Sequence, residues 1–288
     1  MLRLPSFGIQ RRIGRWARRT VGRLLGPSTV LAKLYVPDRA PAGAPDETLD
    51  LDPDETGGED EGLPLPPAKL TLAWNSDLAE YVASGRDHAT AVRRVLEEQE
   101  ATLGAGDALM DWGCGTGRVL RHFAGEAEQA EAWGVDVDAR GVSWAKRHLS
   151  PPFRFVTGTS YPHLPFPDET FSLVFGVSVM THLEHLRDAW VMEIRRVLRP
   201  GGLAILSVHD EHTLAHLQQH GPVGAMGLPE DLAPLMDRDV TVVQGAEWNL
   251  TFTFLHSDHI RREWGCYLDV VDLKPMTFGV QTAVVLRR

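Results

Sequence analysis

A glycine-rich segment constrains the fold of this chain more than any other part of its sequence. Residues 108–120 read ALMDWGCGTGRVL, in which three glycines alternate with other residues directly after an apolar run. An apolar run, a glycine turn and a helix-like segment in this order are typical of a strand–turn–helix unit. Glycines permit a tight turn with positive φ and leave no Cβ atoms to block a ligand. The segment predicts either a ligand-binding turn at the carboxyl end of a strand or a turn that binds nothing.

Strand-like and helix-like runs alternate along the rest of the chain from about residue 69. Helices are expected over 84–103, from about 117, and over 139–149, 186–198 and 258–267. Strands are expected over residues 108–112, 130–136, 153–156, 171–177, 203–208, 250–255 and 282–286. This alternation predicts a parallel sheet with helices on both faces.

Length and composition fit one α/β domain with additions. The chain has 288 residues, of which 43% are hydrophobic, so a sizeable core is expected. No run approaches the roughly 18 apolar residues that a membrane span needs. The two cysteines, Cys114 and Cys266, are too few for a disulfide framework and do not have metal-ligand spacing. We therefore expect a cytoplasmic protein without a bound metal.

Charge divides the chain into three regions: a basic segment, 1–40, an acidic linker, 41–67, and a folded domain, 68–288. The first has nine Lys or Arg and one acid, and its residues 9–26 have an apolar face opposite a row of arginines. Such a helix suits a peripheral contact with an anionic membrane or an acidic partner, and a mobile tail would look the same. The linker, rich in Pro, Gly and acids, is expected to be disordered. The net charge of −10 argues against a nucleic-acid partner.

The spacing of the glycines indicates which ligand the turn binds. A dinucleotide-binding turn follows G-x-G-x-x-G, whereas here the third glycine, Gly117, comes one residue early and Asp111 leads the pattern. An acid at this place repels pyrophosphate and attracts a cationic ligand. Asp136 ends the next expected strand, where a carboxylate can accept both ribose hydroxyls of a nucleoside. Asp138 directly precedes the next helix and is the better candidate for its N-cap.

Four blocks in this order resemble the class I S-adenosylmethionine-dependent methyltransferases: DWGCGTG, GVD, LPFPDETFSLVFGVSVMTHL and RRVLRPGG. The resemblance covers about residues 80–288. It implies a Rossmann-like, seven-stranded, mostly parallel sheet with an antiparallel last strand, which agrees with the two terminal β runs. It also implies that S-adenosylmethionine is the cofactor. Carried over by position, the cofactor-binding residues are Asp111, Gly113, Cys114, Gly115, Asp136, Val137, Thr159, Ser160, Val177 and Ser178.

The chain departs from the family pattern in two places. Many members have an Asp after the glycine that matches Gly158, where it bonds the adenine amino group. This chain has Thr159 and Ser160 there, so a hydroxyl or the backbone is expected to hold the adenine. Ser172 replaces an acid that is common at the fourth strand.

Three histidines are candidates for the general base that a hydroxyl acceptor needs during methyl transfer. His182 follows the fourth strand, His209 ends the fifth, and His256 ends the run that we expect to be the sixth. Histidine is the natural base near neutral pH, although each of the three suits a framework role as well. The long connection 210–249 is placed to form a lid over the acceptor.

The favoured function is O-methylation of a small molecule, such as a sugar or a specialised metabolite. Methylation of a peptide or protein side chain and non-catalytic binding of S-adenosylmethionine are the alternatives. Base-directed N-methyltransferases carry Asn or Asp with Pro-Pro and an aromatic after the fourth strand. This chain has the sequence GVSV at residues 176–179, which argues against methylation of nucleic acid.

Overall fold

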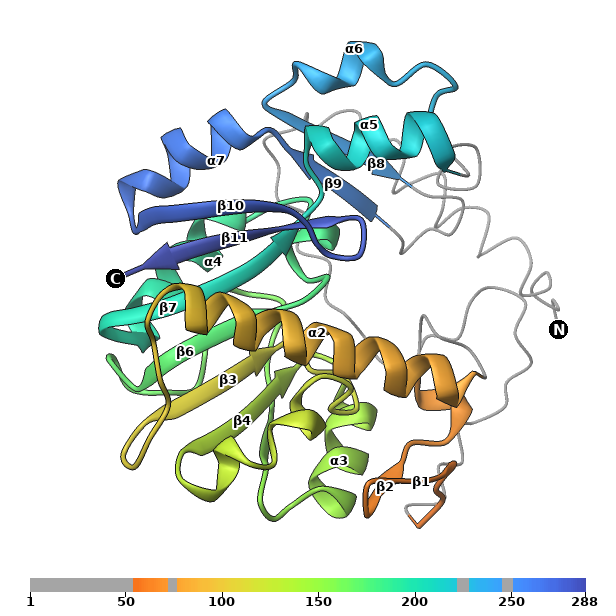
Figure 1. The fold of residues 1–288 in the computed structure, drawn as a ribbon, viewed down its shortest axis with the longest axis vertical. Helices are drawn as coiled ribbons and strands as arrows, with labels where there is room; N and C mark the ends of the chain where they lie inside the picture. Colours follow the sequence, from red (N-terminus) through yellow and green to blue (C-terminus); the bar gives the residue numbers. More distant parts are fainter. Residues whose placement is uncertain (1–53, 72–76, 222–227, 245–250) are drawn as a thin grey trace, which may run out of the picture. The chain divides into compact units, whose positions relative to one another are not determined.

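A seven-stranded sheet organises the described part of this computed structural model, which comprises residues 54–71, 77–221, 228–244 and 251–288 (Figure 1). In spatial order its strands are β10 (Asp269–Phe278), β11 (Gln281–Arg287), β7 (Leu198–Val208), β6 (Phe171–Gly176), β3 (Ala108–Trp112), β4 (Glu131–Asp136) and β5 (Arg154–Thr157). The last strand, β11, is antiparallel to both neighbours, and the pairs from β7 to β5 are parallel. The predicted Rossmann-like sheet is confirmed.

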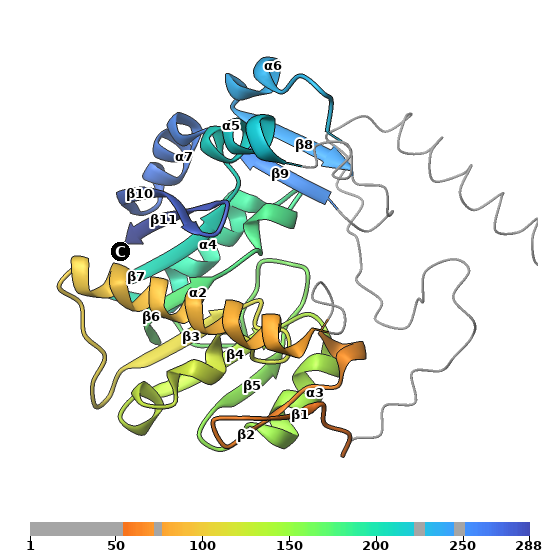
Figure 2. The same cartoon turned by 45° about the vertical axis from the view of Figure 1, so that its right-hand side comes forward.

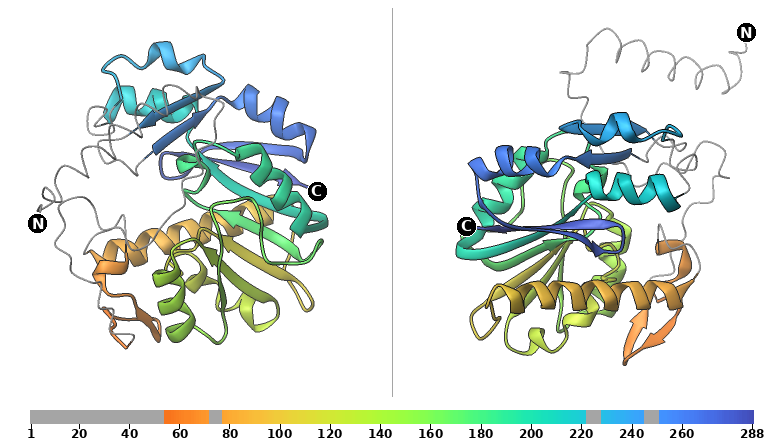
Figure 3. Two further views of the ribbon diagram at one scale, coloured as in Figure 1. Left: turned by 180° about the vertical axis from the view of Figure 1, so that it is seen from behind. Right: turned by 45° about the horizontal axis from the view of Figure 1, so that its top comes forward.

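Helices cover both faces of the sheet: α2 (Leu78–Glu98) and α3 (Ala139–His148) on one, α4 (Arg187–Val197) and α7 (Ser257–Glu263) on the other. Alternate residues of a strand point to opposite faces. In β7, Leu203 and Ile205 therefore join the core under α2 and α3, whereas Ala204 and Leu206 join the core under α4 and α7. Figure 2 shows α2 running across the front of the sheet, and the view from behind in Figure 3 brings α4 forward.

The observed helix starts agree with the sequence predictions in some places and differ from them in others. The Asp138 side chain accepts the N–H of Arg140, so the predicted N-cap of α3 is confirmed. Helix α2 begins at Leu78, earlier than expected, because the Asp77 side chain accepts the first free N–H groups. The α-helix expected from about residue 117 is wrong. Gly117 has a φ of +81°, which no helix accepts, and only short 3-10 turns follow, at η3 (Leu120–Phe123) and η4 (Glu126–Glu128).

A small subdomain is inserted between β7 and the edge strands, and most of it falls in the connection 210–249 for which a lid is expected. Its elements are α5 (Glu211–His220), α6 (Ala233–Met236), β8 (Val240–Gln244) and β9 (Thr251–Leu255). Strands β8 and β9 form their own antiparallel pair and pack with α5 and α6 around a separate apolar cluster. The Leu255 N–H donates to the His209 carbonyl over 2.8 Å, which ties this hairpin to the carboxyl end of β7.

The sixth strand of the sheet was misassigned from the sequence. The run at 250–255 is β9 of the inserted hairpin, and the sixth strand is β10, at 269–278. Strand β10 lies at the sheet edge, where most of its side chains keep some exposure and charged residues are tolerated. It therefore lacks the continuous apolar run by which the buried strands were found.

The second half of the acidic linker is folded, contrary to its expected disorder. It forms a hairpin of β1 (Gly58–Asp60) and β2 (Leu63–Leu65). The buried Arg121 guanidinium donates to the carbonyls of Leu63 (2.8 Å) and Pro64 (3.1 Å), and Trp144 Nε1 donates to the Glu55 carbonyl (2.9 Å). These partners lie far along the sequence, so linker composition carried no sign of them.

Two further expectations concern the membrane. Residues 9–26, the expected amphipathic segment, lie outside the described residues. Within the described ranges, none of the helices combines the length and apolar character required to cross a bilayer.

Candidate cofactor and acceptor site

The three glycines of the turn all have positive φ but serve different purposes. A Cβ atom on Gly113 would lie 2.2 Å from Val179 Cγ2, and one on Gly117 would lie 2.9 Å from Leu149 Cδ1. Gly115 is different, because a Cβ there meets no described atom within 4 Å. The first and third glycines therefore allow close packing, while the second leaves open space beside its backbone.

The Asp136 carboxylate lies beside this open glycine at the end of β4. One oxygen accepts the Gly115 N–H over 2.7 Å, and the other accepts the Asp138 N–H over 2.8 Å. Burial raises the pKa of Asp136, and these backbone donors act against that shift. Each carboxylate oxygen keeps a second lone pair, so the group can still accept hydroxyls of a nucleoside ribose.

Asp111, in β3, is a buried acid with an unsatisfied oxygen. The residue is 2% exposed, and its Oδ2 has no hydrogen-bond partner among the described residues. Burial raises the pKa of Asp111 to about 7, although the nearby Arg118 guanidinium lowers it and Asp136 raises it further. A buried oxygen of this kind suits a cationic ligand group.

The other predicted cofactor residues follow the same strand ends. Cys114 points its sulfur into the core, 2.8 Å from the place of a Cβ on Gly134, so only its backbone borders the turn. Val137 is half-buried directly after Asp136. Thr159 and the half-buried Ser160 follow β5; the exposed Thr159 hydroxyl closes a local turn with the Tyr161 backbone.

Val177 and Ser178 follow β6 on the other side of the turn. Val177 is buried in the core under α2, and Ser178 has a φ of +62°. Val179, the next residue, packs against Gly113. The structure thus brings the predicted cofactor residues together at the carboxyl ends of the parallel strands β3, β4, β5 and β6.

Two of the three candidate histidines share an aromatic contact. His182 lies in a 3-10 turn, η5 (Met180–His182), after β6, and its ring centroid is 5.8 Å from that of Phe252 in β9. His209 follows β7, stacks on Phe254 at 5.1 Å and lies 6.2 Å from Phe252. The inserted hairpin therefore contacts both histidines through its aromatic side chains.

These two histidines differ in their free nitrogen atoms. His182 Nδ1 lies 2.8 Å from the Thr251 carbonyl, which can only accept, so Nδ1 carries the hydrogen and Nε2 has the lone pair. His209 is 5% exposed, and its Nδ1 has no partner among the described residues. Desolvation lowers the pKa of His182, and it lowers the pKa of His209 to about 4 with a further contribution from His182. Both rings are therefore neutral near pH 7.

His256 has a structural role in the fold. It directly follows β9, which is not a strand of the main sheet, and its Nδ1 accepts the Asp258 N–H over 3.1 Å as the N-cap of α7. A nitrogen occupied in this way is a poor proton acceptor, so the geometry favours the other two histidines as the base.

Sequence reasoning missed how α2 supports the glycine turn. A Cβ on Gly85 would lie 2.2 Å from the Arg118 carbonyl, so the helix backbone rests directly on the turn. The buried Tyr81 hydroxyl is 2.9 Å from Thr116 Oγ1 in the same turn. The signal that was overlooked is Asp77 followed three residues later by Glu80, a common start of a helix.

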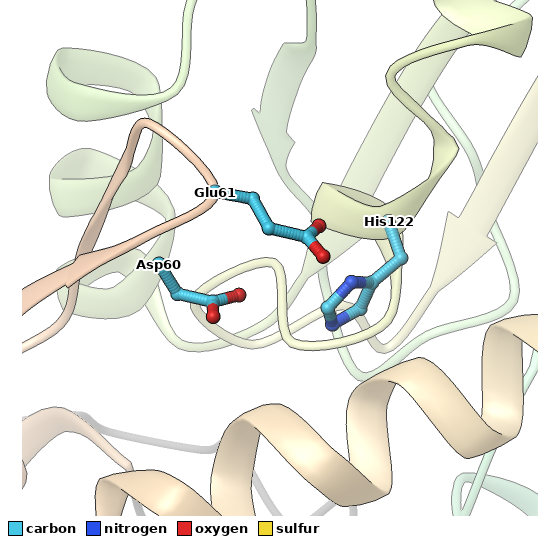
Figure 4. Close-up of side chains that lie close together, drawn as sticks. All are labelled: Asp60, Glu61 and His122. Carbon is cyan, nitrogen blue, oxygen red and sulfur yellow. The ribbon is translucent and has the colours of Figure 1, made fainter.

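Carboxylates and a histidine gather at two other places, although no metal was expected. Asp60 and Glu61 of the β1–β2 hairpin lie beside His122 (Figure 4), and Asp210, Glu211 and His212 lie together at the start of α5. In the first cluster Arg86 lies 3.4 Å from Asp60 and 3.0 Å from Glu61, so both acids already have an ion-pair partner. In the second, Asp210 caps α5 through the Thr213 N–H. Both clusters thus have internal explanations.

Comparison with known proteins agrees with this geometry. Residues 109–202 match the family model described as "Methyltransferase domain". A fatty-acid O-methyltransferase of Mycolicibacterium smegmatis is 31% identical over 138 residues, which is 48% of this chain and 46% of that protein. A demethylmenaquinone methyltransferase of Chlamydia trachomatis is 38% identical over 112 residues, 37% of this chain and 46% of that protein. The chain thus spans less than half the length of these relatives.

Solved structures support the fold. The PH0226 protein of Pyrococcus horikoshii aligns with a TM-score of 0.52 at 18% identity, over 77% of this chain and 95% of that one. A SAM-dependent methyltransferase of Methanosarcina mazei aligns with a TM-score of 0.50 at 16% identity, over 67% and 96%.

The residues at the carboxyl ends of the strands fit S-adenosylmethionine. The unpartnered Asp111 oxygen suits its positive charge, Asp136 suits its ribose, and the open backbone at Gly115 gives it room. The motifs, the sheet order and the matched domain agree, and together they support a class I S-adenosylmethionine-dependent methyltransferase.

Proposed function

We propose that the protein methylates a hydroxyl group of a small molecule, with His182 as the general base. When bound, S-adenosylmethionine supplies a methyl group that is already activated by its sulfonium sulfur. The protein then has to orient the acceptor, exclude water and receive the hydroxyl proton. The arrangement of His182 is the observation that carries this proposal.

His182 is prepared to take a proton at Nε2. The Thr251 carbonyl fixes the hydrogen on Nδ1, which leaves the Nε2 lone pair available. The side chain is exposed, whereas the buried His209 faces the aromatic rings of the hairpin. His182 Nε2 therefore takes the hydroxyl proton, and His209 helps to shape the wall beside it.

The kind of acceptor follows from the inserted hairpin and from the relatives. Phe252 contacts both histidines and keeps partial exposure, so it presents an apolar wall beside the base. The names of relatives include a fatty-acid O-methyltransferase and a sterol 24-C-methyltransferase, both of which act on apolar small molecules. We infer an acceptor whose hydroxyl is attached to an apolar body.

A screen with methyl-labelled S-adenosylmethionine tests this proposal. Apolar alcohols, phenols, carboxylic acids, sugars, amines and peptides serve as acceptors, and mass spectrometry locates the added methyl. With the best acceptor, His182→Ala should lower kcat by roughly 100-fold or more and leave cofactor affinity unchanged. The neighbouring His185, exposed and 3.4 Å from Glu184, gives His185→Ala as a matched control. Unchanged kcat in His182→Ala, or methylation of amines or peptides alone, contradicts the proposal.

A further inference from the structure

Ser178 adopts a backbone conformation that serine rarely takes. Its φ of +62° lies in the left-handed region, which is unfavourable for residues with a Cβ atom. It sits in the segment Val177–Val179, directly after β6, and Val179 packs against the glycine turn at Gly113. A strained residue at such a place persists only where its surroundings hold it.

Two side chains from other strands hold Ser178. Its N–H donates to Ser207 Oγ in β7 over 2.7 Å, and Gln281 Nε2 in β11 donates to Ser178 Oγ over 2.8 Å. Ser207 Oγ in turn donates to Gln281 Oε1 over 2.6 Å. Ser207 has no exposed surface, so water does not compete for the two bonds that its hydroxyl makes.

The shorter contacts of this network assign its donors and acceptors, and a longer contact of 3.2 Å joins Ser178 Oγ to Gln281 Oε1. Ser207 Oγ accepts from the Ser178 N–H, so its own hydrogen goes to the Gln281 carbonyl oxygen. That bond directs the Gln281 amide so that its NH₂ faces Ser178 Oγ. A closed ring of three bonds therefore fixes both the backbone and the side chain of Ser178.

We propose that Ser207 and Gln281 are positioning residues that keep Ser178 left-handed and thereby set the Val177–Val179 segment against the glycine turn for cofactor binding. Neither residue touches the turn in the described contacts, and both act through Ser178. The sheet order explains how this works: β6, β7 and β11 are successive neighbours and β11 is antiparallel, so the carboxyl ends of β6 and β7 meet the amino end of β11, where Gln281 lies.

A double-mutant cycle measured by calorimetry with S-adenosylmethionine alone tests this proposal. Ser207→Ala and Gln281→Leu should each weaken cofactor binding by roughly 3- to 10-fold, the value of one or two hydrogen bonds. Glycine takes positive φ without being held, so Ser207→Ala should have little effect in a Ser178→Gly background. Because no methyl acceptor is used, the outcome is independent of the proposed hydroxyl methylation.

The control is Ser172→Ala, at the other end of β6, where the hydroxyl bonds Asp107 over 2.6 Å. This variant should bind the cofactor as the wild type does. Thermal unfolding of every variant checks that the protein is folded. Equal losses from Ser207→Ala in the wild-type and Ser178→Gly backgrounds overturn the proposal, and so does a loss of stability without a loss of affinity.

Discussion

The state of Asp111 shows how one buried residue connects the fold with the cofactor. The fold removes this carboxyl from water and leaves one oxygen unpartnered, which raises its pKa from 3.8 to about 7. The raised pKa means that the ionised acid makes folding less favourable as the pH rises from 3.8 to 7. A bound cation would reverse this penalty by stabilising the ionised form.

Cofactor affinity should therefore depend on pH through Asp111. The fraction of ionised Asp111 rises roughly tenfold from pH 6 to pH 8, and affinity for S-adenosylmethionine should increase by a similar factor. Calorimetry across this range, in buffers of different ionisation enthalpy, measures both the affinity and the protons released. Asp111→Asn should bind more weakly and show a flatter profile. A wild-type profile as flat as that of Asp111→Asn would contradict this assignment.

At the scale of elements, α2 supports the site although none of the predicted cofactor-binding residues lies in it. Gly85 lets the helix backbone approach the Arg118 carbonyl, and Tyr81 reaches Thr116 of the turn. Helix propensity and tertiary packing thus make opposite demands at Gly85. Alanine is about 1 kcal/mol better than glycine inside a helix, but its methyl group would overlap a backbone oxygen here.

Gly85→Ala should destabilise the protein despite its better helix propensity. The added Cβ would lie only 2.2 Å from the Arg118 carbonyl oxygen, so the backbone has to shift. We therefore expect a loss of roughly 1–3 kcal/mol in the free energy of unfolding and weaker cofactor binding. Urea denaturation and calorimetry measure the two effects. Gly125→Ala is the matched control, because a Cβ there meets nothing within 4 Å and its φ of −65° suits alanine. Equal stability changes in the two variants would refute this account.

The elements that the sequence predicts well are those with local signals. Buried strands such as β3 and β6 appear as apolar runs, and Asp138 marks the start of α3. The edge strand β10 and the β1–β2 hairpin escaped prediction, since exposed edges and long-range partners leave no periodic pattern.

The same distinction separates the two parts of the site. Asp111 and Asp136 were predicted because the motif places them within short stretches at strand ends. The Ser178–Ser207–Gln281 network and the contact between Phe252 and the two histidines unite distant segments. Only the folded sheet and its insertion bring these residues together.

At the scale of the whole molecule, the acidic segment belongs in part to the methyltransferase fold. The Arg121 guanidinium is 3% exposed and relies on the Leu63 and Pro64 carbonyls as acceptors. Removing such acceptors takes hydrogen-bond partners from a buried charge, which costs roughly 2 kcal/mol of folding stability. The folded domain on this side therefore includes at least residues 55–67, beyond the expected start at 68.

Two truncations test this boundary. A chain that starts at residue 54 should keep the unfolding temperature and the cofactor affinity of the full chain, because the described contacts of the hairpin all remain. A chain that starts at residue 67 loses the Arg121 and Trp144 partners, and its Tm should fall by about 5 °C or more. Arg121→Met in the full chain should reproduce part of that fall, since it removes the same bonds while keeping the hairpin. Differential scanning calorimetry measures all three. If the chain from residue 67 has the same Tm as the full chain, the β1–β2 hairpin does not stabilise the fold. A lower Tm means that the acidic segment stabilises the domain through its contacts with Arg121 and Trp144.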